Sequence, residues 1–247
     1  MILTIQNVSK HFGGVKAVNK CSFKIKEGQI TALIGPNGAG KTTLFDIISG
    51  FLQSDSGAIY CCGKNEITNL KPHQIANLGV GRTFQQTRLF NNLTIQENLL
   101  LAIDNENTKF WKNLFLLNRV TKEKIKKVHE TLKLVNLHEH TNKKCLNLSY
   151  GQQKLVEIAR ILIKSHKLIL LDEPVAGVNP KIRQDIKYLL RELKKQNQTI
   201  LLIEHDMNFV MDIADHIIVM DEGKVIAQGN PKQIQKNKKV LEAYLGA

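Results

Sequence analysis

The chain has 247 residues, 43% of them hydrophobic, and a formal net charge of +13 at pH 7, which is enough chain for one large domain or two small lobes. No apolar run approaches the roughly 18 residues of a membrane span, and the opening MILTIQNVSKHF lacks the layout of a signal peptide. We therefore expect neither an integral membrane protein nor a secreted one.

The cysteines and the charged residues indicate the redox environment of the chain and the kinds of partner that it could bind. The four cysteines show no C-x-x-C spacing, which argues against a zinc site and a disulfide framework, so we expect a reduced, cytosolic chain. Residues 109–144 hold ten Lys or Arg against three Asp or Glu. This charge fits nucleic acid or an anionic membrane surface, but it also fits a composition rich in Asn and Lys, so charge alone decides nothing.

Short alternating segments open the chain and predict a small antiparallel sheet. They are ILTIQNV (2–8), CSFKIKEG (21–28) and GAIYCCGK (57–64).

The motif GPNGAGKTT, residues 35–43, has the spacing G-x-x-x-x-G-K-T. A loop that wraps a polyphosphate must point successive backbone N–H groups inward, and glycine permits the dihedrals that this requires. At these positions Lys41 would reach the β- and γ-phosphates, and the Thr42 hydroxyl would ligate Mg²⁺. The motif therefore predicts a P-loop.

The flanks of the motif agree with that prediction. QITALIG (29–35) is typical of a buried strand, and a helical stripe follows, which Gly50 is expected to close. The helix N-terminus would then face the phosphates. The stripe consists of Leu44, Ile47, Ile48 and Phe51.

The pattern is helical from about 71 to 165, and three apolar runs follow. KLILLD (167–172), TILLIEH (199–205) and HIIVMD (216–221) are separated by helical stretches at 181–195 and 206–214. Such runs are typical of a parallel sheet covered on both faces. Pro180 is expected at position N1 of a helix with the apolar stripe Ile182, Ile186, Leu189, Leu190 and Leu193. An α/β core interrupted by a helical lobe is therefore predicted.

Acidic and imidazole side chains end two of these runs. Asp172 in LILLDEP stands where a P-loop fold holds Mg²⁺, and Glu173 beside it can act as a general base. His205 ends the next run and can reach the γ-phosphate. The alternatives are a solvated strand end and a structural histidine.

The motif LSYGQQ, residues 148–153, has the capping-box spacing S-x-x-Q at Ser149 and Gln152, followed by the stripe Leu155, Ile158, Ala159 and Leu162. Taken alone it predicts only a helix start. With a P-loop upstream and LDEP downstream, it indicates a second anion-binding helix terminus, at which Ser149 and Gly151 present a hydroxyl and an amide.

The chain resembles the ABC-type ATPases over nearly its whole length. The elements that carry this resemblance, in chain order, are the Walker A motif GPNGAGKTT, the Q-loop glutamine Gln85 in GRTFQQ, the signature LSYGQQ, the Walker B motif LILLDEP, the D-loop VAGVNP and the H-loop histidine His205. The resemblance implies an α/β fold with a P-loop (RecA-like) parallel-sheet core, an antiparallel β subdomain and an inserted helical signature subdomain. Residues 1–247 would form one ABC ATPase domain, with the core at about 1–85 and 166–247 and the helical subdomain at about 86–165.

The resemblance also implies ATP and Mg²⁺ as ligands and assigns a role to each matching residue. The implied nucleotide-binding residues are Phe12, which lies under the adenine, and Gly35, Pro36, Asn37, Gly38, Ala39, Gly40, Lys41, Thr42 and Thr43. The implied catalytic residues are Glu173, His205 and Gln85, and the implied metal ligands are Thr42, Gln85 and Asp172. The implied signature residues, which close over ATP of a second chain in a head-to-tail dimer, are Ser149, Tyr150, Gly151 and Gln152, with Asn179 in the D-loop.

Three positions depart from the usual family pattern. The family has glycine where Tyr150 stands, tyrosine where Phe12 stands and aspartate where Asn179 stands. Phe12 keeps a stacking face and loses only a hydroxyl. Tyr150 is compatible with the signature if its side chain points away while Gly151 makes the close approach.

Several motifs are similar to those of the ATPase subunits of branched-chain amino acid importers: FGGVKAVN, GRTFQ, LTIQENLL, SYGQQ, AGVNP, LIEHDMNFVM and AYLGA. That branch carries a segment like residues 103–120, in which Phe110, Trp111, Leu114 and Phe115 form an amphipathic patch. The patch either packs on the helical lobe or contacts a permease or membrane surface.

The resemblance implies an energy-coupling ATPase that acts with a second ATPase chain, with membrane-spanning permease subunits and indirectly with a solute-binding protein. We expect it at the cytoplasmic face of the inner membrane, docked through apolar residues such as Phe90 and Leu93, and we expect no nucleic acid. ATPases of urea or amide import, or of lipopolysaccharide export, remain alternatives, although the export branch is not known for GRTFQ. ABC proteins of DNA maintenance or translation carry coiled-coil insertions or tandem cassettes, and a P-loop kinase would leave LSYGQQ unexplained.

Overall fold

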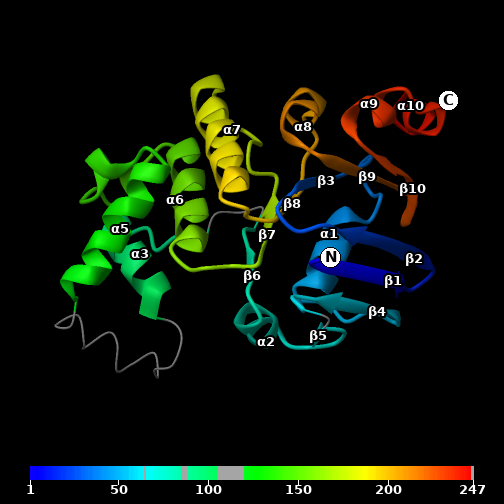
Figure 1. Ribbon diagram of the computed structural model, residues 1–247, viewed down its shortest axis with the longest axis horizontal. Coiled ribbons are helices and arrows are strands. Elements are labelled where there is room, and N and C mark those ends of the chain that lie inside the picture. The colour runs from blue at the N-terminus through cyan, green and yellow to red at the C-terminus, as the bar shows by residue number, and fades with distance from the viewer. Residues whose placement is uncertain (64, 85–87, 105–119, 246–247) are drawn as a thin grey trace. The chain divides into compact units, whose positions relative to one another are not determined.

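The computed structural model describes residues 1–63, 65–84, 88–104 and 120–245, which form two compact units (Figure 1). The first unit comprises Met1–Arg82, His166–Pro174 and Leu190–Ala247, and the second comprises Thr83–Ser165 and Val175–Leu189. Residues 175–189, which are predicted from the sequence to belong to the core, group with the helical unit.

An antiparallel sheet of order β2-β1-β4-β5 opens the first unit, as the alternating segments predicted. Its strands are β1 (Leu3–Phe12), β2 (Val15–Ile25), β4 (Ser56–Cys61) and β5 (Asn65–Glu66). Alternate side chains such as Leu3 and Ile5 are buried because one face of the sheet covers the core. The register of β1 against β2 shifts between Ile5 and His11, so the last part of β1 is irregular.

A six-stranded sheet of order β10-β9-β3-β8-β7-β6 forms the centre of the first unit. Its strands are β3 (Ile30–Ile34), β6 (Val80–Arg82), β7 (Leu168–Asp172), β8 (Ile200–Ile203), β9 (His216–Asp221) and β10 (Lys224–Gly229). All pairs are parallel except β9 with β10. Every residue of β3, β7 and β8 is buried, which confirms the predicted α/β core with both faces covered.

Two strands of this sheet were missed by the sequence analysis. The three residues of β6 include Gly81 and lie in the stretch that was assigned to helices, which was wrong at this point. Strand β10 alternates weakly and is only partly buried. Strands this short, or this exposed, leave no period for sequence reasoning to detect.

The described helices of the first unit include α1 (Lys41–Ile48), α2 (Pro72–Asn77), α8 (Met207–Ile213), α9 (Pro231–Gln235) and α10 (Lys238–Leu245). Helix α1 buries Leu44, Ile47 and Ile48 in a core shared with both sheets. Gly50 follows the helix with φ +76°, as expected for a helix-closing glycine. Phe51, however, lies beyond the helix and is 52% exposed, so its predicted place in the buried stripe was wrong.

The second unit is helical, with α3 (Ile95–Asp104), α5 (Lys122–Leu134), α6 (Tyr150–Leu162), short 3₁₀ turns at His138–His140 and Cys145–Asn147, and the first part of α7 (Pro180–Lys195). Pro180 begins α7, and the predicted apolar stripe of that helix is buried throughout. The helices that the structure describes are all too short or too polar to cross a membrane.

Candidate nucleotide site

The P-loop lies between the buried strand β3 and helix α1 and has a left-handed backbone at Gly38 and Gly40. Neither end of the loop tolerates a side chain. A Cβ atom on Gly35 would lie 2.0 Å from the Met220 carbonyl oxygen, and one on Gly40 would lie 2.1 Å from the Ala17 carbonyl oxygen. The loop is therefore held closely against the end of β9 and the start of β2, which requires glycine at both positions.

The N-terminus of α1 receives no side-chain cap, because its N-cap residue is Gly40. Helices α5, α6, α8 and α9 are capped instead by Thr121, Ser149, Asp206 and Asn230. The first backbone N–H groups of α1 thus remain available to an anion, which the helix dipole favours at this end. Thr42 is exposed on this first turn, and Asn37 and Gly38 are exposed on the loop before it.

Lys41 is buried in the loop that carries it, with 5% of its surface exposed. Its Nζ donates hydrogen bonds of 2.8 Å to the carbonyl oxygens of Gly35 and Pro36. Burial lowers the pKa of Lys41, while the nearby carboxylates of Glu173 and Asp172 raise it. The ammonium is therefore positioned by the loop and lies within the field of both acids.

Asp172 ends β7 and is 3% exposed. The guanidinium of Arg82, at the end of the neighbouring strand β6, lies 3.5 Å from Asp172 Oδ2 and 2.7 Å from Asp46 Oδ1. Arg82 also donates a hydrogen bond of 2.5 Å to Ser49 Oγ. Burial raises the pKa of Asp172, and Arg82 acts against that rise.

Sequence reasoning did not single out Arg82. A charged residue at the end of a buried strand would have indicated its role, but the strand that it ends, β6, was not predicted. The guanidinium links Asp46 of α1 to Asp172 of β7, so it fixes the helix that follows the P-loop to the strand that carries the predicted metal ligand.

Glu173 and His205 contact each other beyond the ends of β7 and β8. The distance between Glu173 Oε1 and His205 Nε2 is 2.9 Å. The backbone of Glu173 is left-handed, with φ +49°, a conformation that costs energy for a residue with a side chain. This turn lets two consecutive acids, Asp172 and Glu173, both address the same edge of the sheet.

Phe12 ends β1 and is 50% exposed. It pairs with Val15 at the tip of the β1–β2 hairpin, and the Nζ atom of Lys10 lies 5.7 Å from the centre of its ring. An exposed aromatic face is available to a planar ligand at this tip.

The signature residues lie in the second unit, at the start of α6. Ser149 Oγ accepts a hydrogen bond from Gln152 N, and Gln152 Oε1 accepts one from Ser149 N, so the predicted capping box is confirmed. Tyr150 is 47% exposed. A Cβ atom on the buried Gly151 would lie 3.0 Å from Ile182 Cγ1. Close packing against α7 is therefore a sufficient reason for glycine at this position. Asn179 caps α7 by accepting a hydrogen bond of 2.9 Å from Ile182 N.

Gln85, which the sequence analysis assigned to the Q-loop, lies outside the described residues, as do Phe110, Trp111, Leu114 and Phe115. The described residues contain no group of three or more His, Cys, Asp or Glu side chains that could hold a metal ion. Thr42 and Asp172 nevertheless supply the hard oxygen atoms that Mg²⁺ prefers when it is bound by one or two protein groups and substrate phosphates. The donor set therefore fits Mg²⁺.

The family model described as "ABC transporter" matches residues 18–176, and the one described as "Branched-chain amino acid ATP-binding cassette transporter" matches residues 224–247. The first match spans more than half of the chain, so the protein belongs to the ABC transporter family. It is accordingly a nucleotide-binding ATPase of the cassette type.

Relatives of known description within this family are ATP-binding proteins of branched-chain amino acid transport. The high-affinity branched-chain amino acid transport ATP-binding protein BraF of Pseudomonas aeruginosa is 45% identical over 250 residues, which cover 99% of this chain and 98% of BraF. The LivG protein of Escherichia coli, which has the same description, is 40% identical, with 99% of this chain and 98% of LivG covered.

Solved structures agree with this membership. The ADP conformation of an ATP-binding cassette of an ABC transporter matches with a TM-score of 0.87 and 37% identity and covers 100% of this chain and 99% of that one. A dimeric cassette bound to ADP and Pi matches with a TM-score of 0.79 and 28% identity and covers 93% and 99% of the two chains. The family assignment and the predicted fold class are thus confirmed.

Replacing Arg82 by methionine should lower the free energy of unfolding by about 3 kcal/mol at pH 7, because it leaves the buried Asp172 carboxylate without its guanidinium partner. The deficit should shrink as the pH falls, because protonation of Asp172 removes the buried charge. Guanidinium chloride unfolding measures both effects.

The control for Arg82→Met is Lys126→Met, which breaks the exposed pair Lys126–Glu130 and should cost about 0.5 kcal/mol or less. The double variant Arg82→Met/Asp172→Asn should recover part of the lost stability. An Arg82→Met protein as stable as the wild type would show that the guanidinium does not support Asp172.

Proposed function

We propose that this chain is the ATP-hydrolysing, energy-coupling subunit of a membrane ABC importer for branched-chain amino acids. The supporting observation is that Lys41, Asp172 and the Glu173–His205 pair gather at one edge of the six-stranded sheet, beside the uncapped start of α1. In open α/β sheets, ligands bind at the carboxyl ends of the strands. The relatives' transport of branched-chain amino acids and the match at residues 224–247 support the substrate class.

The polyphosphate of ATP would bind over the P-loop. Backbone N–H groups of residues 36–43 would surround it, the dipole of α1 would favour its charge, and the Lys41 ammonium would bind the β- and γ-phosphate oxygens. The exposed ring of Phe12 would stack on the adenine. Thr42, Asp172 and Gln85 would hold Mg²⁺, which neutralises charge on the β- and γ-phosphates.

Glu173 would act as the general base. Its carboxylate would accept a proton from the water that attacks the γ-phosphate, while the Nε2–H group of His205 donates a hydrogen bond to Glu173 Oε1 and orients it. A carboxylate held by a second side chain and by a strained backbone is positioned before substrate arrives, so little reorganisation is needed during the reaction.

The signature would serve a second nucleotide. Ser149, Tyr150, Gly151 and Gln152 lie in a different unit from the P-loop, and a head-to-tail dimer would bring the signature of one chain to ATP held by the other, with Asn179 at the interface. A solved cassette that is dimeric with ADP and Pi bound supports a dimer. The second chain can be identical or a paralogue.

We further propose that the protein is a peripheral subunit on the cytoplasmic face of the inner membrane, attached to permease subunits and coupled through them to a solute-binding protein. Phe90, in the segment after Gln85, is 45% exposed and offers an apolar contact for such a permease. Urea or amide import and lipopolysaccharide export remain alternatives, since similar cassettes can energise several permeases.

Replacing Glu173 by glutamine should leave MgATP binding intact and lower the rate of hydrolysis by roughly 10²–10⁴, the range typical of losing a general base. The variant should also accumulate as an ATP-bound dimer, because hydrolysis is what separates the chains. Single-turnover hydrolysis and size-exclusion chromatography with ATP measure the two effects. Near-normal turnover would remove Glu173 from the role of base.

Mixing two inactive variants should restore activity if each site needs two chains. Lys41→Ala removes the cation from the P-loop, and Ser149→Asp keeps a good N-cap residue on α6 while it repels the phosphate. Their complementary halves should form one intact composite site per mixed dimer. ATPase rates of each variant alone and of the mixture decide the matter, and a mixture as inactive as its parts would contradict the shared site.

Deleting the gene in its own organism should abolish high-affinity uptake of leucine, isoleucine and valine. The wild-type chain should restore that uptake, whereas Glu173→Gln should not, because it cannot complete the cycle. Initial uptake of radiolabelled leucine and of radiolabelled urea provides the measurement. Loss of urea uptake with normal leucine uptake would transfer the assignment to an amide importer.

A further inference from the structure

Strand β1 extends beyond the end of β4, one of the two strands that pair with it. Strand β4 begins at Ser56, which is paired with Ser9, so residues 10–12 continue beyond the first residue of β4. On the other edge β1 stays paired with β2 as far as Phe12 and Val15. One edge of this segment therefore needs a hydrogen-bond acceptor from outside the β4 ladder.

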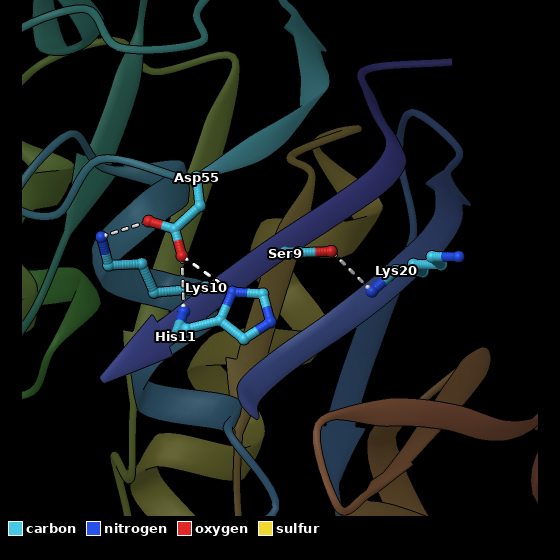
Figure 2. A network of polar contacts seen from close by, with 5 residues as sticks. All are labelled: Ser9, Lys10, His11, Lys20 and Asp55. Atoms are coloured by element: carbon cyan, nitrogen blue, oxygen red, sulfur yellow. Dashed lines mark hydrogen bonds and ion pairs between the residues drawn. The ribbon is translucent and has the colours of Figure 1, made fainter. Parts of the chain in front are cut away.

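Asp55 supplies that acceptor. Its backbone N–H donates to the Ser9 carbonyl at 2.9 Å. Its Oδ2 accepts a hydrogen bond of 2.6 Å from His11 N (Figure 2). His11 Nδ1 lies 3.0 Å from the same oxygen, and Lys10 Nζ lies 2.8 Å from Oδ1. Because a carboxylate only accepts, His11 Nδ1 carries the proton in this contact. Together these contacts hold the pKa of Asp55 at about 2, with the Lys10 hydrogen bond as the largest cause.

The other edge of the segment is fixed by a second side chain. Ser9 Oγ accepts a hydrogen bond of 3.0 Å from Lys20 N, near the shifts in register between β1 and β2 (Figure 2). Residues 9–11 are therefore held by side-chain acceptors on both sides.

Phe12 lies at the tip of the β1–β2 hairpin, where it is paired with Val15. The ring is 50% exposed, and the two residues that follow are glycines, the first with φ +55°. The Lys10 ammonium lies 5.7 Å from the ring centre, and that ammonium is bound to Asp55. The place of the ring thus depends on the backbone before it and on Lys10, both of which Asp55 fixes.

We propose that Asp55 is a positioning residue for the base of the nucleotide: by fixing Lys10 and His11, it holds the Phe12 ring where a purine stacks. This inference rests on the proposed role of Phe12 as the adenine platform. It places the effect of Asp55 on the base end of the ligand and leaves the phosphate end to the P-loop.

The test compares ATP with inorganic tripolyphosphate, which carries the phosphates without a base. Dissociation constants for both are measured by calorimetry on the full chain for the wild type, Asp55→Ala, Phe12→Ala and the double variant. Phe12→Ala should weaken ATP binding by about 5- to 150-fold, the range for loss of one base–aromatic stack. Asp55→Ala should weaken it by less than Phe12→Ala does, roughly two- to tenfold, because the stacking ring is displaced but still present, and should leave tripolyphosphate binding within about twofold.

The double variant should bind ATP no more weakly than Phe12→Ala alone, because Asp55 acts through that ring. Asp55→Glu, which keeps the charge, should recover part of the loss. Glu192→Ala is the matched control, since it breaks an ion pair of 2.7 Å with Lys195 in the same unit but on α7, which contributes no strand to the sheet of β1.

The outcomes separate the two proposals. If Phe12→Ala weakens ATP binding and Asp55→Ala does not, the role of Asp55 is wrong and the platform stands. If Phe12→Ala leaves ATP binding unchanged, the platform fails and the Asp55 proposal fails with it. If Asp55→Ala weakens ATP and tripolyphosphate equally, Asp55 supports only the fold of its unit.

Discussion

Buried charge at the carboxyl edge of the six-stranded sheet is the constraint on which the rest of the site depends. Asp172 is buried where water cannot solvate it, so its ionised form requires a nearby cation. Arg82 provides it at 3.5 Å and at the same time binds Asp46 of α1. The helix after the P-loop is thereby tied to the strand that carries the acids, and Lys41 lies in the field of both. Because β6, β7 and β8 are neighbours in the sheet, Arg82, Asp172 and His205 lie at or just beyond the ends of adjacent strands.

The side chains and loops on either side of this edge are also fixed in place, at both ends of the proposed nucleotide site. At the phosphate end, close contacts with Met220 and Ala17 fix the loop through its glycines, and Lys41 is bound by the loop carbonyls. At the proposed base end Phe12 is half exposed, and the Asp55 carboxylate fixes the backbone before it by accepting a hydrogen bond from His11 N. A rigid loop suits phosphate, whose contacts are directional and charged, whereas stacking tolerates an exposed ring as long as the backbone below it is fixed.

Most of the core and the strand–loop–helix frame of the P-loop could be predicted from the sequence, because runs such as LILL (168–171) and ILLI (200–203) are apolar at every position and the P-loop spacing is specific. The features that were not predicted are not marked by any regular spacing of apolar residues that would distinguish them. Strand β6 is three residues long, and without it the partners of Arg82 could not be inferred. Asp55 was missed because its contacts cross 45 residues of sequence to Lys10. Phe51 fitted a helical stripe, but the chain leaves the helix at Ser49 and Gly50, before that residue is reached.

The two helix starts differ in a way that matters for their proposed ligands. The start of α1 has no side-chain cap, so its backbone N–H groups can bind phosphate without first giving up a partner. At the start of α6, Ser149 Oγ already accepts from Gln152 N, and Gln152 Oε1 from Ser149 N. A hydroxyl that accepts still has its own proton to donate, so Ser149 can donate to a phosphate oxygen while it continues to cap the helix. Structural capping and a role at the nucleotide of a second chain are therefore compatible in this residue. The capping-box spacing does not by itself distinguish a signature from an ordinary helix start.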